Sequence, residues 1–334
     1  MPNEKLKKYL NDIVWWIPFR KLRDFIRELV YTILEIKEQN DIILHFIREL
    51  NNNIDSNRQY IVVQMTSGLT DQLYIYRLGY SIEKLYNKKV IYDISFYETC
   101  ITNGIQRTKR KFEILNIFND FSLNIANENQ IQVAKNFYID GFKYINIDIS
   151  ETIKNNKILY LNAVNAWCIK IKLIEFDKIF DLDKYILPKL DNDNKRVYED
   201  IKNYKHSVAC HIRRTDYINH PYRRYNLLDE NYFIKAIEKI NKQIIGKLKI
   251  YFFSDDMDWV KNKLIPLVKN KYDYIAVDIN DNDRGYFDFY LISNCKYQIA
   301  SEGRFCETAH IFNKYKNKIL ITPNDIDEKY IRNK

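Results

Sequence analysis

An apolar run that ends abruptly in charged side chains is the most informative stretch of this sequence. The residues Val-Ala-Cys-His-Ile (208–212) lead directly into Arg213, Arg214 and Asp216, with His211 inside the run. Such a run predicts a buried strand, and open α/β sheets bind ligands at the C-terminal ends of their strands. Guanidinium groups carry permanent charge in a planar fork suited to phosphate oxygens, and Asp216 can hold one of them in place. The segment indicates a diphosphate site, with a solvated charge cluster as the alternative.

A group of carboxylates follows the next predicted strand. Asp256 and Asp258 have the Asp-x-Asp spacing of some metal sites, and Asp255 precedes them. Carboxylates between a strand and a helix are commonly helix N-caps, however. We therefore interpret them as caps and expect no metal there.

The motif His-x-Arg-Arg-x-Asp-Tyr (211–217) resembles that of the α1,2-fucosyltransferases of glycosyltransferase family 11, which α1,6- and protein O-fucosyltransferases share in shorter form. Segments 250–260 and 288–296 resemble a strand-to-helix turn and the next helix of that family. Gly-Leu-Thr-Asp-Gln (68–72) is similar to the family's Gly-Leu-Gly-Asn-Gln loop. The resemblance runs from about residue 61 to about residue 323.

This resemblance implies an inverting glycosyltransferase of the GT-B fold that needs neither cofactor nor metal. The implied donor is GDP-fucose, and the implied product is an α1,2 linkage to a galactose hydroxyl. The glycan acceptor would be a bacterial lipopolysaccharide or O-antigen precursor.

The resemblance also implies roles for individual residues. Arg213 would neutralise the departing β-phosphate, since a positive group aimed at developing charge can replace a metal. His211 would read the guanine edge, and Asp288 would hold the guanine unless it is an ordinary first-turn carboxylate. Arg214 is better interpreted as the partner of Asp216 or of another carboxylate. The donor-binding residues expected are His211, Arg213, Ser254, Asp255, Asp288, Ser301, Arg304 and Phe305.

Two segments depart from the family pattern. In the loop that contains Gly68 and Gln72, Asp71 replaces an asparagine. At 304–308, Arg-Phe-Cys-Glu-Thr replaces Ser-Phe-Ser-Trp-Trp, so Arg304 supplies charge where the family uses hydroxyls and amides. Another sugar nucleotide is therefore the alternative donor. The catalytic base stays open, with Asp216, Asp229, Glu230 and Asp71 as candidates.

Composition describes a globular protein with a large core. The 334 residues are 46% hydrophobic and 15% aromatic, which excludes a disordered chain. A net charge of +9 suits an anionic ligand, whereas scattered tyrosines and 44 acidic residues argue against a nucleic-acid partner. Five cysteines without Cys-x-x-Cys spacing, together with no signal peptide and no membrane-spanning run, predict a cytoplasmic location.

The N-terminal region has two features of its own. Residues 1–27 combine basic side chains with Trp15 and Trp16, a combination typical of peripheral contact with a membrane, here the cytoplasmic face of the inner membrane. Packing of the tryptophans on the catalytic domain is the alternative. Residues 22–50 carry a heptad seam with Asn40 at an a position. The seam predicts a parallel homodimeric coiled coil, with a helix packed on its own domain as an equal alternative.

Alternating apolar runs and helical patterns predict an α/β protein with parallel sheets and helices on both faces. We place an N-terminal helical extension at 1–57, a Rossmann-like acceptor domain at 58–195 and a Rossmann-like donor-nucleotide domain at 196–334. The two domains would face a cleft, with a linker at 190–205. A coiled-coil scaffold with a degenerate transferase domain is the non-enzymatic alternative.

Overall fold

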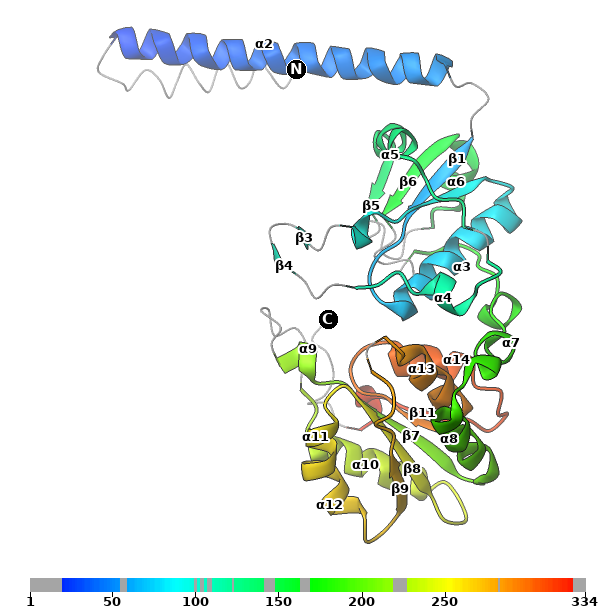
Figure 1. The fold of residues 1–334 in the computed structure, drawn as a ribbon. Coiled ribbons are helices and arrows are strands. Elements are labelled where there is room, and N and C mark those ends of the chain that lie inside the picture. Colours follow the sequence, from blue (N-terminus) through cyan, green and yellow to red (C-terminus); the bar gives the residue numbers. More distant parts are fainter. Residues whose placement is uncertain are drawn as a thin grey trace.

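Two parallel sheets form the body of the chain (Figure 1). The computed structural model describes residues 20–54, 59–98, 101–102, 105–106, 110–121, 123–140, 148–162, 169–218, 227–281 and 283–326. One sheet has four strands in the order β2-β1-β6-β5, and the other has five in the order β11-β10-β7-β8-β9. Every neighbouring pair in both sheets is parallel, which confirms the predicted α/β class.

The first sheet belongs to the N-terminal half of the body. Its strand β1 is buried except at its last residue, Gln64, because its apolar residues point alternately into two cores on opposite faces. Helix α3 packs in the larger core and α5 in the smaller. The elements are β1 (Tyr60–Gln64), α3 (Leu69–Tyr86), β2 (Val90–Asp93), η1 (Ser95–Tyr97), β3 (Ile101–Thr102), β4 (Ile105–Gln106), α4 (Ile114–Ile117), α5 (Glu128–Lys135), β5 (Tyr138–Asp140), α6 (Ser150–Asn155) and β6 (Ile158–Asn162).

The second sheet holds the motif strand β7 at its centre. Helices α10 and α12 cover one face, and α13 and α14 lie in the core on the other. The elements are β7 (Ser207–Ile212), α9 (Thr215–Ile218), α10 (Glu230–Asn241), β8 (Lys249–Ser254), α11 (Met257–Trp259), the π-helical turn η5 (Val260–Leu264), α12 (Ile265–Val268), β9 (Asp273–Ala276), α13 (Gly285–Asn294), β10 (Tyr297–Ile299), α14 (Phe305–Ile311), β11 (Ile319–Ile321) and η6 (Pro323–Asp325). The strands predicted in this half are thus confirmed.

The connection between the two sheets contains helices and helical turns. It comprises η3 (Phe176–Lys178), α7 (Leu182–Tyr185), η4 (Leu187–Lys189) and α8 (Asn192–Asn203). The linker expected at 190–205 lies in this connection, but most of it is helix α8. The predicted domain division between 195 and 196 falls inside that helix and stays a prediction. The ring of Tyr198 on α8 stacks on Tyr290 of α13 with centroids 5.7 Å apart. The division at 57/58 lies outside the described residues.

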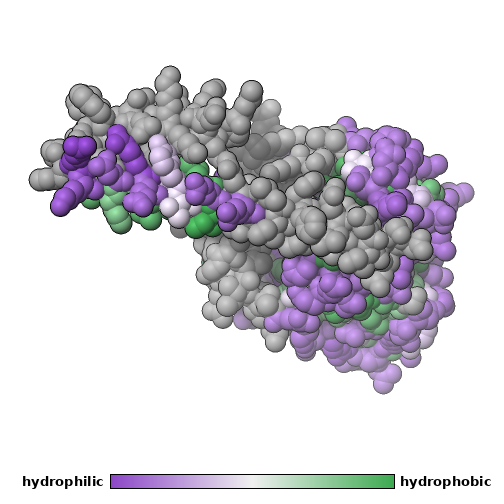
Figure 2. Space-filling model, turned by 90° about the horizontal axis from the view of Figure 1, so that it is seen from above, coloured by the Kyte–Doolittle hydropathy of each residue, from purple (hydrophilic) through white to green (hydrophobic). Residues whose placement is uncertain are grey.

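Helix α2 (Arg20–Ile54) confirms that the seam region is helical and stands apart from both sheets in Figure 1. Among its described apolar side chains, Leu34 is buried and Ile26 and Val30 are half-buried, whereas five are exposed. Figure 2 shows green atoms along one side of the helix. The exposed fractions are 46% for Leu22, 61% for Phe25, 48% for Leu29, 53% for Ile33 and 52% for Ile36. The side chain of Asn40 and residues 1–19 lie outside the described part. Within that part, no helix is both long and apolar enough to cross a bilayer.

The exposed seam makes self-association testable. In a parallel coiled coil, Ile33→Glu with Ile36→Glu should remove two core positions and weaken the dimer by more than about 100-fold, because each buried isoleucine contributes about 1.5–3 kcal/mol. Asn40→Ile should tighten association and loosen the choice of oligomer. Sedimentation at micromolar concentration measures both effects.

Glu35→Lys, off the seam, is the matched control and should leave the sedimentation coefficient unchanged. A full-length chain that sediments as a monomer would contradict the coiled-coil interpretation.

Candidate functional site

The C-terminal ends of β7 and β10 form the topological switch point of the second sheet, the place where open α/β sheets have their ligand crevice, and we refer to it as the crevice. These strands pair in parallel, with Cys210 opposite Ile299, while β8 pairs with the other side of β7. The chain moves outward from β7 to β8 and β9, then returns to the other side as β10. Such a reversal in strand order is where open α/β sheets bind ligands. The arginine motif and the segment 301–305 therefore lie on either side of this switch point. That they bind the donor stays a prediction.

His211 is fixed at this point by the neighbouring strand end. Its carbonyl accepts the Ser301 amide at 3.1 Å, and its Nδ1 lies 3.2 Å from Ser301 Oγ. The Phe305 ring stacks on the imidazole with centroids 5.3 Å apart. Burial, aided by the charge of Arg213, lowers the His211 pKa to about 3. The imidazole is thus neutral near pH 7, with one nitrogen to donate and one to accept.

Tyr217 joins Arg213 to the loop after β10. The Arg213 guanidinium lies 5.4 Å from the centre of the Tyr217 ring, and the Tyr217 hydroxyl donates to the carbonyl of Glu302 at 3.1 Å. Gly303 has a φ of +99°, and a Cβ there would come within 2.7 Å of the same hydroxyl. Sequence reasoning missed both Tyr217 and Gly303, although the tyrosine closes the motif and glycine is rare in this chain.

Arg214 has a structural role, as expected, but its partner comes from β8. Its Nε donates to Asp256 at 3.2 Å, and its guanidinium lies 4.0 Å from the centre of the Trp259 ring. Asp255 accepts the Arg214 amide at 2.8 Å and the Thr215 hydroxyl at 2.7 Å. The side chain of Asp216 lies outside the described part of the chain.

The carboxylates after β8 serve as caps and turn supports. Asp256 caps α11 by accepting the Trp259 amide at 3.1 Å, which confirms the predicted N-cap. Ser254 Oγ accepts the Asp256 amide at 3.0 Å. With Asp255 engaged by the arginine turn, these residues hold the β7–α9 turn in place. Across the described residues, no group of three or more His, Cys, Asp or Glu has the arrangement of a metal site.

The loop after β1 is held by the buried side chain of Gln72. Its Nε2 donates to the carbonyls of Ser67 (3.2 Å) and Lys111 (2.8 Å), and its Oε1 accepts the amides of Glu113 (2.9 Å) and Ile114 (3.1 Å). Gln72, which was expected as a residue of this loop, holds the loop to the segment 111–114. Gly68 is the N-cap of α3 and has open space where a Cβ would be.

Asp71 places a carboxylate within electrostatic reach of three arginines. It lies in the first turn of α3, and the charges of Arg304, Arg110 and Arg213 all act on its carboxylate. Burial outweighs these three positive charges and raises the Asp71 pKa above its usual value. The two departures from the family pattern, Asp71 and Arg304, are therefore neighbours across the two halves.

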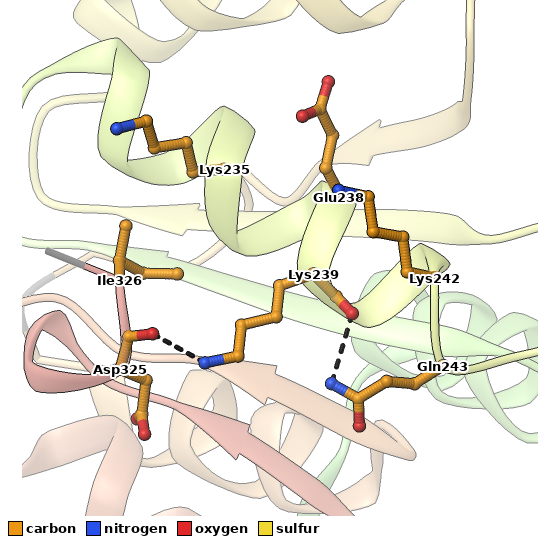
Figure 3. A pocket seen from close by; sticks show the side chains of 7 residues that line it. All are labelled: Lys235, Glu238, Lys239, Lys242, Gln243, Asp325 and Ile326. Carbon is orange, nitrogen blue, oxygen red and sulfur yellow. Dashed lines mark hydrogen bonds between the residues drawn. The ribbon is translucent and has the colours of Figure 1, made fainter.

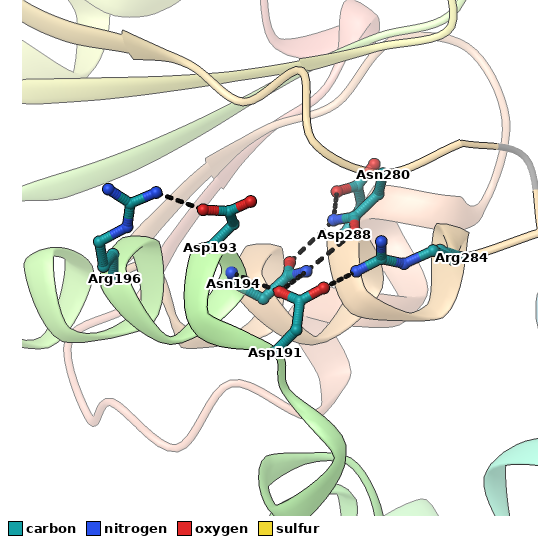
Figure 4. A network of polar contacts seen from close by, with 7 residues as sticks. All are labelled: Asp191, Asp193, Asn194, Arg196, Asn280, Arg284 and Asp288. Atoms are coloured by element: carbon teal, nitrogen blue, oxygen red, sulfur yellow. Dashed lines mark hydrogen bonds and ion pairs between the residues drawn. The ribbon is translucent and has the colours of Figure 1, made fainter.

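Asp288 sits in a polar network between α8 and α13 (Figure 4). Asn280 Nδ2 donates to Asp288 at 2.7 Å, and Asn280 and Asn194 exchange two hydrogen bonds of 2.9 and 3.0 Å. Asp191, the N-cap of α8, accepts from Asn194 and pairs with Arg284. Burial raises the Asp288 pKa to about 7, so its charge depends on pH near neutrality.

Two further features lie on or beside helix α10. Asp229 caps α10 by accepting the Tyr232 amide at 3.0 Å, and Glu230 lies in the first turn of that helix. A surface hollow lies by the C-terminal part of α10, where Lys239 Nζ donates to the Asp325 carbonyl at 2.6 Å (Figure 3). It is lined by Lys235, Glu238, Lys239, Lys242, Gln243, Asp325 and Ile326, none of them an expected site residue.

Known proteins resemble this chain over most of its length. The family model described as Glycosyl transferase family 11 matches residues 112–334. From Escherichia coli, the "O-antigen biosynthesis glycosyltransferase WbnK" is 24% identical over 286 residues (78% of this chain, 92% of that protein), and an "Alpha-1,2-colitosyltransferase" is 23% identical over 279 residues (79% and 91%).

Solved structures similar to this chain include two fucosyltransferases. "NodZ alpha-1,6-fucosyltransferase soaked with GDP-fucose", an enzyme from Bradyrhizobium, has a TM-score of 0.42 and 12% identity, covering 77% of this chain and 93% of its own. A mutant of Arabidopsis thaliana FUT1 in complex with GDP has a TM-score of 0.42 and 11% identity, covering 79% and 70%.

The raised pKa of Asp288 predicts a stability effect. A carboxyl whose folded pKa exceeds its unfolded value stabilises the fold below the unfolded pKa, and that contribution is lost as pH rises through about 7. Asp288→Asn stays neutral, so its free energy of unfolding relative to wild type should rise by about 1–4 kcal/mol from pH 4 to pH 9. Urea unfolding across this range measures it.

Asp193→Asn is the control, because Asp193 is an exposed aspartate near the start of α8 that pairs with Arg196. Its difference from wild type should stay flat with pH. Parallel curves for wild type and Asp288→Asn would contradict the buried, protonated state.

Proposed function

The chain belongs to glycosyltransferase family 11, and we propose that it transfers L-fucose from GDP-fucose to a galactose hydroxyl with inversion, forming an α1,2 linkage. The acceptor we propose is a lipopolysaccharide or O-antigen precursor, in line with the O-antigen glycosyltransferase among its relatives. The two parallel sheets support a GT-B architecture with the donor at the second sheet. The enzyme would work at the cytoplasmic face of the membrane, in peripheral contact through residues 1–27.

The observation that carries this proposal is the crevice between β7 and β10. Arg213 and Arg304 bring two permanent charges to it, which suits the negative charge that develops on a departing diphosphate. Neutral His211 has Nδ1 beside Ser301 Oγ, which leaves Nε2 for one hydrogen bond to a base edge. Asp288, when ionised, would accept from the donor groups of guanine.

A second donor is favoured by one specific observation. Asp71 and Arg304 both depart from the family pattern and face each other, and one relative is a colitosyltransferase. GDP-colitose is therefore the first alternative to GDP-fucose. Binding of either to the folded chain raises its melting temperature, so a thermal-shift panel of GDP-, UDP-, ADP- and CMP-sugars ranks the donors. A chain that binds none of them would be a scaffold with a degenerate transferase domain.

Arg213 provides the sharpest mutational test. Arg213→Ala should lower kcat/KM with GDP-fucose by about 100- to 1,000-fold, the cost of about 2.7–4 kcal/mol of preorganised stabilisation. Arg213→Lys should restore little, because an ammonium lacks the planar fork. Arg196→Ala, which removes an exposed arginine paired with Asp193, is the control and should retain full activity. More than a tenth of wild-type activity in Arg213→Ala would refute the role.

Metal independence is a separate expectation. Arginine side chains are proposed to do the work of a cation, so turnover should survive EDTA and should not change with added magnesium or manganese. Activity that disappears in chelator and returns with metal would instead assign a cation to Asp256 and Asp258.

A further inference from the structure

Asp71 is a half-buried carboxylate with no direct partner in the described part of the chain. Among those residues, no hydrogen bond or ion pair within 4 Å engages its side chain, in contrast to the carboxylates of Asp255 and Asp256. A carboxylate removed from water in this way needs hydrogen bonds to offset its desolvation. Its oxygens are available to accept from a ligand.

The surroundings of Asp71 belong to both halves of the chain. From the second half, Arg304 and Arg213 act on its charge, and from the first half Arg110 does so. Tyr97 of η1 also faces it, since the charge of Asp71 helps to raise the Tyr97 pKa. The Arg304 guanidinium lies 6.0 Å from the centre of the Tyr74 ring, which follows Asp71 by one turn of α3. Asp71 thus lies close enough to the arginine assigned to the phosphate for the charge of that arginine to act on its carboxylate.

The backbone that carries Asp71 is rigid. The adjacent residue Gln72 is fully buried and makes four hydrogen bonds to flanking segments. The Ser67 carbonyl, on a residue with a φ of +65°, also accepts from the Tyr97 hydroxyl at 3.1 Å. Groups held this way need little reorganisation at the moment of reaction.

We propose that Asp71 is the general base that deprotonates the acceptor hydroxyl. The inference rests on the proposed transfer. As the acceptor oxygen bonds to the anomeric carbon, its proton passes to a carboxylate oxygen of Asp71. The bond between the anomeric carbon and the phosphate oxygen breaks, and GDP leaves with the electron pair, its charge balanced by Arg213 and Arg304. The Asp71 carboxyl then returns its proton to water.

Inversion fits this placement. The hydroxyl must attack the face of the sugar opposite the diphosphate, so the base and the phosphate-binding arginine must approach from different sides. Asp71 comes from the first half of the chain and Arg213 from the second, which is compatible with that requirement. The rival carboxylates are less suited: Asp229 caps α10, and Glu113 is influenced by Arg110, Lys111 and Asp283 instead of the crevice arginines.

Burial makes this carboxylate more basic than an exposed one, while its three arginines work against that effect. A base acts when ionised, so the rate should fall as pH drops through the Asp71 pKa. The acidic limb of the kcat/KM profile would then belong to Asp71.

Asp71→Asn is the decisive variant, because it keeps the shape and restores the amide of the resembled family. With GDP-fucose and an aryl β-galactoside as acceptor, kcat should fall by about 100- to 10,000-fold, and the acidic limb should disappear. GDP binding by calorimetry should be unchanged or up to about tenfold tighter, since a negative charge beside Arg213 and Arg304 is removed.

Two more variants complete the design. Asp120→Asn, at an exposed ion pair with Lys184 in the same half, should behave as wild type, and Glu113→Gln tests the nearby rival. Asp71→Asn with more than a tenth of wild-type kcat, weaker GDP binding in that variant, or a larger loss of kcat in Glu113→Gln would each overturn the role.

The identity of the donor can be refuted independently of the role of Asp71. If wild type turns over another sugar nucleotide, the same comparison with that donor still decides the role of Asp71. A wild-type chain without any transferase activity would overturn both proposals.

Discussion

The parallel pairing of β7 with β10 is the constraint on which the rest of the site depends. Strands distant in sequence become neighbours there, and their C-terminal ends deliver His211 and Ser301 to one place. Neither residue is positioned by its own loop alone: the Ser301 amide bonds the His211 carbonyl, and Phe305 covers the imidazole. A shift of one residue in this register would exchange the two faces of the strand and remove the imidazole from the crevice.

Two consecutive arginines do different work because different partners hold them. Arg214 is bound by the Asp256 carboxylate and the Trp259 ring, so its charge is used within the fold. Arg213 lies against the ring of Tyr217, and Arg304 against that of Tyr74. An aromatic face orients a guanidinium without cancelling its charge.

Patterns of burial explain what the sequence could predict. Strands such as β7 and β8 are short apolar runs buried on both faces, so their positions follow from composition alone. Helix α8 was missed because its first turns are polar, and only contacts with α13 show which side is buried. The roles of side chains that hydrogen-bond the backbone of other segments were the hardest to predict from the sequence. Gln72 was expected only as a residue of the N-terminal loop and Ser254 as a donor-binding residue, and the hydrogen bonds of both run to backbone groups that only the folded chain brings near.

The two departures from the family pattern are best understood together. An aspartate added alone beside a diphosphate would repel the diphosphate. An arginine added alone would raise the affinity of the site for the diphosphate and slow its release. Asp71 lies on α3 in the first half of the chain, and Arg304 is the N-cap of α14 in the second half. They are more than two hundred positions apart in the sequence, yet the charge of Arg304 acts on the Asp71 carboxylate. Because opposite charges at this distance offset each other, the crevice can gain a carboxylate while its affinity for an anion is maintained. The arginine thereby allows a base to sit where the family has a neutral amide.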